Sequence, residues 1–149
     1  MPIVLHQPQI PPNTGNIARL CVGTQTILHL IGPLGFSIDD KELKRAGLDY
    51  WKDLTCFYHD DFEHFLKNIQ PQRMFFYSTK GQRPYTQVIY TADDFLIFGS
   101  ETQGLPALLL KKYAEHVYTI PMYGPIRSLN LSTAVGIVLY EALRQIKKF

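Results

Sequence analysis

The segment RSLNLSTAVGIVLYEALRQIKKF, residues 127–149, decides how this chain folds. It opens with Ser128, Asn130 and Ser132, whose side chains can accept hydrogen bonds from the free N–H groups at the start of a helix. Residues 134–140 are apolar nearly all the way round, so a helix there must be covered on every side, by the core or by a second subunit. A polar loop held by a buried helix is a good frame for a binding site.

The composition is that of a globular chain with a core of its own. Of its 149 residues, 46% are apolar and 19% are charged, and a formal net charge of +2 permits nucleic-acid binding without demanding it. The apolar runs are far shorter than the roughly 20 residues that span a bilayer, and no secretory signal is visible. We therefore expect one cytoplasmic domain, residues 1–149, with Cys21 and Cys56 as reduced core thiols.

Short apolar runs alternate along the chain with segments of helical pattern. The predicted strands are residues 2–6, 26–31, 54–58, 74–78, 95–98 and 117–120, with helices between them and after the last. We expect Pro11 and Pro12 to force an extended loop, Asp39 to cap the second helix, and residues 79–84 to form a polar loop. Continuous apolar strands separated by helices predict an α/β fold, with a mostly parallel sheet flanked by helices.

Three polar loops follow predicted strands and should meet at one edge of the sheet, where ligands of such folds bind. They span residues 11–19, 99–105 and 122–132. Asn16 and Arg19 lie three residues apart, which suits either a phosphate site or an ordinary helix start with an exposed arginine. Gly99 and Gly104 allow close approach of the backbone to a ligand, and Glu101 between them is either a site residue or a solvated turn carboxylate.

Other chemistries find little support in the motifs. The glycine-containing loop matches neither a Walker A sequence nor GxGxxG, so a nucleoside-triphosphate site is disfavoured. No Ser-His-Asp or Cys-His set is readable. The histidines of HDDFEH, residues 59–64, are five apart and share no helix face, so we expect no metal site.

A basic cluster stands in the middle of the chain. Lys41, Lys44 and Arg45 fall at helical spacing and make one basic face. Such a face is either solvated or bound to an RNA backbone, and Tyr50 and Trp51 nearby would offer stacking surfaces in the second case. Arg127, in the third loop, is likewise either an anion ligand or a surface charge.

Taken together, NTGNIAR (13–19), FGSETQGLP (98–106) and RSLNLSTAV (127–135) resemble the three ordered motifs of the SPOUT ribose 2′-O-methyltransferases. The similarity covers nearly the whole chain. IPPNTGNIARLC (10–21) and KRAGLDYW (44–51) are most similar to family members that methylate the wobble nucleotide, C34 or modified U34, of leucine tRNAs. The alternatives are 2′-O-methylation at another tRNA or rRNA position, and a cofactor- or RNA-binding module without turnover.

The resemblance implies a fold, a cofactor and partners that spacing does not show. The C-terminal part would be threaded into a deep trefoil knot, an exception to the rule against knots. The cofactor would be S-adenosylmethionine, with no metal, and the RNA partner would be the anticodon loop of leucine tRNA. The protein would be a homodimer with its terminal helices at the interface.

The resemblance also implies residue roles. The cofactor pocket would use Tyr77, Ser78, Thr79, Gly99, Glu101, Gly104, Ile120, Met122, Ser128, Leu129 and Ser132. The catalytic group would be Arg19, supported by Asn13, Asn16, Glu101 and Asn130. RNA would contact Arg19, Lys41, Lys44, Arg45, Arg127 and Tyr140, although Tyr140 fits packing in a dimer interface better. Because a guanidinium stays protonated, we expect Arg19 to clamp a phosphate and orient the hydroxyl rather than act as a base.

Overall fold

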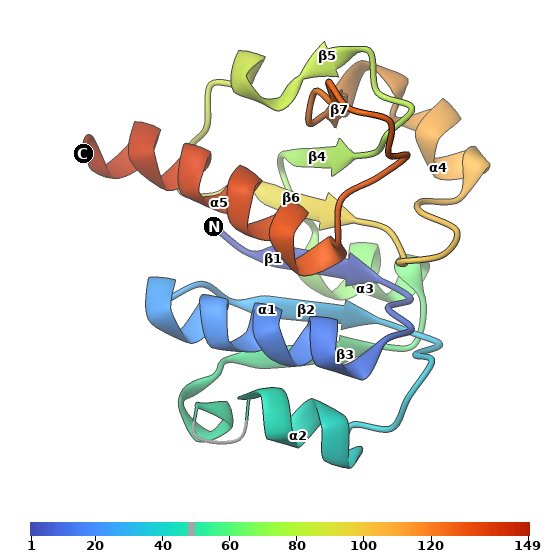
Figure 1. The fold of residues 1–149 in the computed structure, drawn as a ribbon, viewed down its shortest axis with the longest axis vertical. Coiled ribbons are helices and arrows are strands. Elements are labelled where there is room, and N and C mark those ends of the chain that lie inside the picture. Colours follow the sequence, from blue (N-terminus) through green and yellow to red (C-terminus); the bar gives the residue numbers. More distant parts are fainter. Residues whose placement is uncertain (48–49) are drawn as a thin grey trace.

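Strands that are all parallel to their neighbours form one sheet in the computed structural model, which describes residues 1–47 and 50–149. They are β1 (Ile3–His6), β2 (Leu28–Ile31), β3 (Cys56–His59), β4 (Met74–Tyr77), β5 (Arg83–Pro84), β6 (Phe95–Phe98) and β7 (Val117–Thr119). Their order across the sheet is β3-β2-β1-β6-β4-β7-β5. The predicted α/β class with a parallel sheet is confirmed (Figure 1).

Helices cover both faces of this sheet. They are α1 (Pro11–Thr24), α2 (Lys41–Gly47), α3 (Phe62–Ile69), α4 (Ala107–Lys112) and α5 (Leu131–Lys147), with short 3₁₀ turns η1 (Trp51–Asp53), η2 (Tyr85–Gln87) and η3 (Ala114–His116). Helices α1 and α5 pack together over one face, and α2 packs beside α1 (Figure 1). Side chains of α3 and α4 cover the other face. Within the part of the chain that the structure describes, no helix combines the length and apolarity needed to cross a bilayer.

The central strands of the sheet are buried on both faces, as their continuous apolar sequences predict, whereas Phe57 and Tyr58 of the edge strand β3 are half-exposed. Ile3 and Leu5 of β1 belong to the core under α1 and α5, whereas Val4 belongs to the core under α3. The pleat of a strand sends successive side chains to opposite faces, so both faces of a central strand need apolar residues. Parallel pairing also places the carboxyl ends of β1, β4, β6 and β7 at one edge, where their loops emerge.

The terminal helix is only partly covered within one chain. Val135, Val138 and Leu139 are fully buried against the sheet and α1. Tyr140 remains 50% exposed, and Ile137 is half-buried. The core of the chain itself therefore covers only one side of this helix, and the side that carries Tyr140 and Ile137 faces outward.

Three local expectations are wrong. Pro11 and Pro12 do not force an extended loop but occupy the first turn of α1, where the missing N–H would have no partner in the helix anyway. The second helix begins at Lys41, and Asp40 rather than Asp39 accepts from the backbone N–H groups of its first turn. The loop 79–84 is not wholly irregular, because its last two residues pair with β7 as the edge strand β5.

A buried pair of histidines links β2 and β3. The Nδ1 atom of His29 lies 2.9 Å from Nε2 of His59, and both rings are nearly excluded from solvent. Phe57 stacks on His29, and Phe65 meets both imidazoles edge-on. Burial lowers the pKa of His29 to about 4, with the neighbouring His59 as the second cause, and burial also lowers the pKa of His59. Both rings are therefore neutral in the folded protein near pH 7.

This pair predicts acid sensitivity at mild pH. Unfolded histidines gain protons below about pH 6.5, whereas His29 in the fold stays neutral down to about pH 4. The unfolded state thus binds more protons in this window, and the free energy of unfolding should fall as the pH falls from about 6.5 to about 4. Urea unfolding at several pH values measures this slope. It should shrink in His29→Phe and persist in the control His116→Gln, an exposed histidine; equal slopes in all three proteins would contradict the assignment.

Candidate active site

A cavity of about 500 Å³ opens at the carboxyl ends of β4, β6 and β7. Cavities that hold small-molecule ligands are roughly 300–1,000 Å³ in volume. The loops after these strands form most of its wall, and residues from the starts of α1 and α5 complete it. The cavity therefore lies where a parallel sheet is expected to bind ligands.

Glu101 joins the second predicted loop to the entry of α1. Its carboxylate oxygens accept from the backbone N–H of Gln9 at 2.9 Å and of Ile10 at 2.7 Å. Since Pro11 and Pro12 have no N–H and Ile10 has no side-chain cap, the carboxylate supplies an acceptor that the helix start lacks. The sequence allowed Glu101 to be either a site residue or a solvated turn carboxylate. In the structure its hydrogen bonds join the loop after β6 to the segment before α1.

Asn13 and Asn130 continue this chain of hydrogen bonds to the third loop. The amide nitrogen of Asn13 donates to Glu101 at 3.3 Å, and its carbonyl oxygen accepts from the amide of Asn130 at 2.9 Å. The other end of Asn130 caps α5 by accepting from the backbone N–H groups of Ser132 and Thr133. The prediction that the three polar loops meet is confirmed by this chain of hydrogen bonds.

Two predicted catalytic residues lie apart from this chain of contacts. Asn13, Glu101 and Asn130 line the cavity, but Asn16 and Arg19 are exposed on α1 and do not line it. Arg19 is six residues beyond Asn13, about 9 Å further along the helix axis at 1.5 Å per residue. Its guanidinium carbon lies 5.0 Å from the centre of the Tyr50 ring, in a cation–π arrangement.

The residues predicted for the cofactor gather around the cavity with one exception. Those that line it are Tyr77, Ser78, Thr79, Gly99, Glu101, Gly104, Ile120, Met122, Ser128 and Leu129. Ser132 instead donates to Asn130 at the start of α5 and is not part of the lining. Sequence reasoning missed Lys80, which adjoins a predicted residue, and Leu110, which comes from α4 and left no signal in any motif.

The predicted RNA-binding residues are spread over two regions. Arg127 lines the cavity, and Tyr140 stands half-exposed on α5. Lys41 and Arg45 are exposed on α2, while the side chain of Lys44 lies outside the described part of the structure. The cations among them that the structure describes are exposed and therefore accessible to a polyanion.

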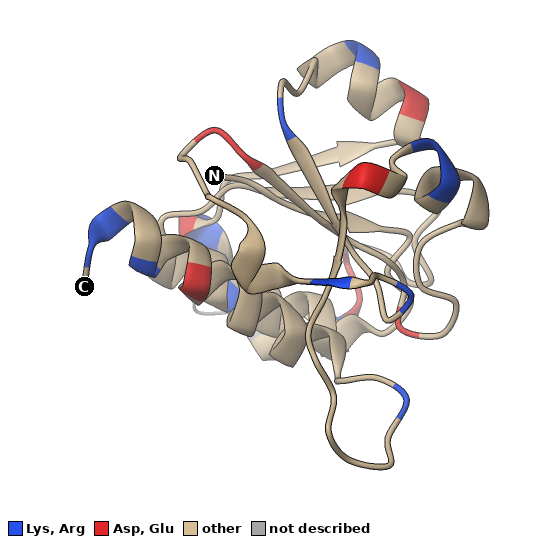
Figure 2. Ribbon diagram, turned by 90° about the horizontal axis from the view of Figure 1, so that it is seen from above, with Lys and Arg blue, Asp and Glu red and all other residues tan. Residues whose placement is uncertain are grey.

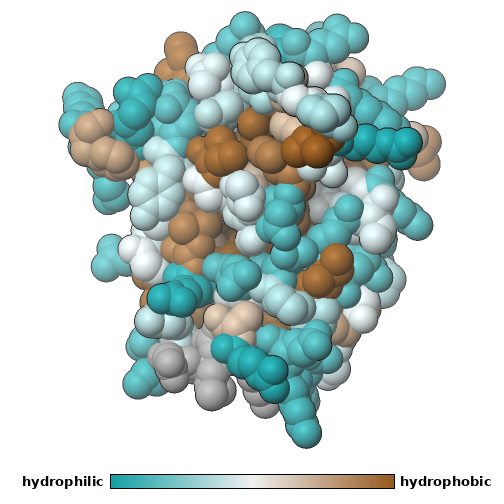
Figure 3. Space-filling model, in the orientation of Figure 1, coloured by the Kyte–Doolittle hydropathy of each residue, from teal (hydrophilic) through white to brown (hydrophobic). Residues whose placement is uncertain are grey.

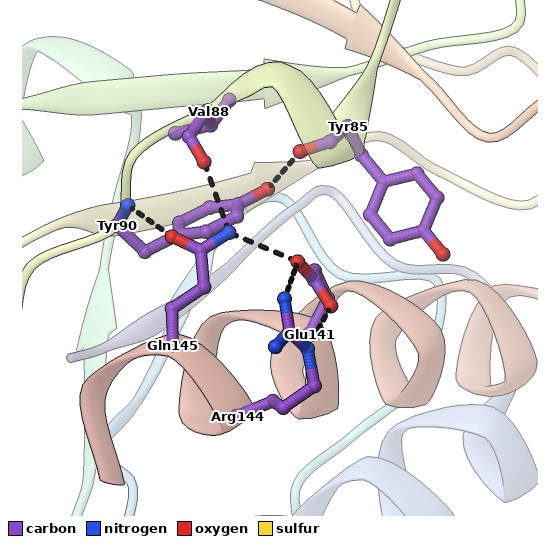
Figure 4. A network of polar contacts seen from close by, with 6 residues as sticks. All are labelled: Tyr85, Val88, Tyr90, Glu141, Arg144 and Gln145. Atoms are coloured by element: carbon purple, nitrogen blue, oxygen red, sulfur yellow. Dashed lines mark hydrogen bonds and ion pairs between the residues drawn. The ribbon is translucent and has the colours of Figure 1, made fainter. Parts of the chain in front are cut away.

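A polar network anchors the floor of the cavity to α5. The hydroxyl of Tyr77, which lines the cavity, lies 2.9 Å from that of Tyr90, and burial raises the pKa of both phenols. Gln145 accepts from the backbone N–H of Tyr90 and donates to Val88 and Glu141 (Figure 4). The same helix that carries the Asn130 cap therefore also holds the segment behind the cavity.

The charged residues in the described cavity lining are Lys80, Glu101 and Arg127. Both oxygens of Glu101 face N–H donors from its own chain, so its negative charge is turned toward the protein. Lys80 and Arg127 are exposed at the rim, and Figure 2 shows basic positions on the loops around this end of the sheet. The opening of the cavity is thus basic and would attract an anionic group, such as a phosphate, that approaches its rim.

Sites of other kinds are not found in the described chain. Among residues 1–47 and 50–149, no three His, Cys, Asp or Glu side chains are grouped as metal ligands would be. His59 is in the buried pair, and His64 lies beside Asp61, which caps α3. Cys21 and Cys56 are free thiols, and burial raises the pKa of Cys21 to about 12, so it stays protonated.

The Glu101 contacts predict a stability effect. Glu101→Gln replaces one carboxylate oxygen with an NH₂ group. Because that position faces a backbone N–H of Gln9 or Ile10, one hydrogen bond is lost and two donors face each other. We expect the free energy of unfolding to fall by about 1–2 kcal/mol, a typical figure for hydrogen bonds to a charged group at a partly exposed site. Urea unfolding measures this, with Glu115→Gln, an exposed glutamate, as the control. Equal destabilisation by the two changes would count against a special role for Glu101.

Comparison with known protein sequences identifies a family. The SpoU rRNA Methylase family matches residues 1–140. A putative tRNA (cytidine(34)-2′-O)-methyltransferase of Bacillus subtilis is 51% identical over 96% of this chain and 91% of its own length. The tRNA (cytidine(34)-2′-O)-methyltransferase of Escherichia coli K12 is 51% identical over 97% of this chain and 92% of its own.

Solved structures agree with these relatives. One described as giving insight into the 2′-OH methylation of C/U34 on tRNA superimposes with a TM-score of 0.94 at 43% identity, covering 99% of this chain and 96% of that one. An rRNA methyltransferase from Sinorhizobium meliloti with bound AdoMet gives a TM-score of 0.85 at 26% identity, covering 95% of this chain and 55% of that one.

Proposed function

Because this chain belongs to the SpoU rRNA methylase family, we propose that it transfers a methyl group from S-adenosylmethionine to the ribose 2′-hydroxyl of nucleotide 34, the wobble position, of leucine tRNAs. The observation that carries the proposal is the 51% identity, along nearly the whole chain, to enzymes named for this reaction. One catalytic domain, residues 1–149, would perform it in the cytoplasm, where its tRNA is found.

The cavity suits S-adenosylmethionine in size and in chemistry. It holds about 500 Å³ and combines apolar walls, such as Phe98, Leu105 and Ile120, with polar groups from Ser78, Thr79 and Ser128. Apolar walls with a few placed polar groups are typical of sites for a purine nucleoside. When bound there, the cofactor supplies a methyl group on a sulfonium, which is already a good electrophile.

The chain must then align the ribose hydroxyl and help it lose a proton. Alignment of reactants in attack geometry can lower a barrier by roughly 7–11 kcal/mol. We assign the alignment to Arg19, whose exposed guanidinium can bind a phosphate beside the reacting ribose in a two-pronged contact. The hydroxyl proton would leave to that phosphate or to water. Asn13, Glu101 and Asn130 would keep the loops in place through the hydrogen bonds described above.

A homodimer would complete the structure. Figure 3 shows apolar residues exposed on the face where α1 and α5 lie. Tyr140 and Ile137 of α5 are part of the incompletely covered side of that helix. A second copy packed there would bury them, and sedimentation at micromolar concentration should show a dimer; a monomer would contradict this part of the proposal.

We also propose, from the family resemblance, that the C-terminal segment forms the trefoil knot.

Transfer of labelled methyl from S-adenosylmethionine to unmethylated leucine tRNA tests the proposal, with the product nucleoside mapped. The expected product is a 2′-O-methyl at nucleotide 34, and the same anticodon stem-loop with a 2′-deoxyribose at that position should accept no methyl. A methyl on another nucleotide would discard the substrate. No transfer by protein that still binds the cofactor would discard the enzymatic activity.

A further inference from the structure

The loop between β7 and α5, residues 120–130, carries the most exposed aromatic ring of the described chain. Tyr123 is 96% exposed, and Ile126 on the same loop is 58% exposed. Figure 2 shows the loop before α5 standing away from the body of the molecule, with a basic position on it. An aromatic ring held out in water has both faces free for a planar partner.

This ring stands directly beside the cavity. Met122, its neighbour in sequence, lines the cavity, and so does Arg127 on the other side of the loop tip. Tyr123 itself is not part of the lining, so it belongs to the rim and not to the pocket that holds the small ligand. A large molecule that reaches into the cavity next to Met122 and Arg127 would therefore have this loop as a neighbour.

The charges around the opening favour a polyanion. Lys80 and Arg127 are exposed cations at the rim, while the carboxylate of Glu101 is turned to the backbone N–H groups of Gln9 and Ile10. An exposed ring and exposed cations around one opening are the combination with which proteins bind single-stranded nucleic acid, since bases stack on the ring and phosphates bind the cations.

We propose that Tyr123 stacks on a base adjacent to the methylated nucleotide and that Lys80 and Arg127 bind the flanking phosphates. This inference rests on the proposed function and adds the part of the chain that holds the substrate strand. A second protein copy fits the loop less well, because the exposed ring is accompanied by rim cations rather than by a continuous apolar surface. Stacking of Tyr123 on this base would hold the RNA in place while the reacting ribose reaches into the cavity.

The test compares Tyr123→Ala, Tyr123→Phe and the control Phe149→Ala. Phe149 is also an exposed ring, 69% accessible, but lies beyond the far end of α5, about 26 Å from its start. The probe is a leucine tRNA anticodon stem-loop with an unmethylated ribose at position 34. Tyr123→Ala should weaken its binding by about 5- to 100-fold, as loss of one base stack does, whereas Tyr123→Phe and Phe149→Ala should bind within about twofold of wild type.

Salt dependence tests the two cations. Lys80→Gln and Arg127→Gln should each reduce the slope of log affinity against log salt by about 0.7, the value for one contact to a single-stranded phosphate. S-adenosylmethionine affinity should stay unchanged in Tyr123→Ala, since the ring lies outside the cavity lining. Unchanged slopes would overturn the phosphate contacts.

The outcomes separate this inference from the proposed function. If wild-type protein methylates nucleotide 34 but Tyr123→Ala binds the stem-loop as tightly as wild type, the stacking role is wrong and the function stands. If Tyr123→Ala dissociates a dimer while each protomer binds RNA normally, the loop contacts a second copy and the proposal is again overturned. If wild-type protein neither binds nor methylates the stem-loop, the proposed function itself fails.

Discussion

Replacing Arg19 with alanine is expected to slow methyl transfer by about 10²-fold, the loss that a misplacement of reacting groups by about 1 Å can cause. S-adenosylmethionine should still bind with wild-type affinity, because Arg19 is exposed on α1 and does not line the cavity. Single-turnover methylation and calorimetric cofactor binding measure the two effects separately. A fall in cofactor affinity would show that Arg19 had been placed in the wrong role.

Two further variants distinguish a bidentate phosphate contact by Arg19 from a general contribution of its positive charge. Arg19→Lys keeps a charge but loses the planar fork, so activity restored by lysine would mean that no bidentate contact is needed. Arg45→Ala, on the exposed face of α2, removes a cation of the same kind away from the reacting groups. It should weaken RNA binding at low salt with little change in the single-turnover rate at saturating RNA. An equal loss of rate in both alanine variants would leave Arg19 as one phosphate contact among several.

Gly99→Ala is expected to have the largest effect on the fold of the site. A Cβ atom at this position would overlap the backbone of Gly104 and Leu105, and Gly104 is held there by its pairing with Ser100. Backbone atoms cannot swing aside as a long side chain can, so the loop would have to move. We expect a loss of about 1–3 kcal/mol in the free energy of unfolding, the usual cost of overpacking, together with weakened cofactor binding.

Gly23→Ala provides the matched control for this change. Gly23 lies within α1, and a Cβ atom there would meet nothing within 4 Å. Alanine favours a helix over glycine by about 1 kcal/mol, so this variant should be as stable as wild type or slightly more so. Urea unfolding of both variants compares them directly. Gly99→Ala with wild-type stability and cofactor affinity would mean that the loop tolerates displacement and that its close packing is not required.

The sequence was sufficient to predict a mostly parallel sheet flanked by helices and the three loops that form the site, but not the order of the strands or the edge strand β5. Apolar runs such as Phe95–Phe98 have no polar face, so they had to become strands buried on both sides, and helices had to cover them. Once the strands are parallel, their carboxyl ends share an edge, and the loops after them must meet there. Turn and cap residues were harder to interpret: Pro11 and Pro12 were expected in an extended loop, although they form the first turn of α1.

The side-chain partners were decided only by the tertiary structure. Glu101 is 88 residues from Asn13, and Asn13 is 117 residues from Asn130, so no local pattern could show that they form one hydrogen-bonded chain. The cation–π contact of Arg19 with Tyr50 likewise depends on how α1 lies against the segment at the start of η1. Periodicity records which face of an element is buried, whereas the partner of a polar group depends on which distant segments the folded sheet brings to the same edge.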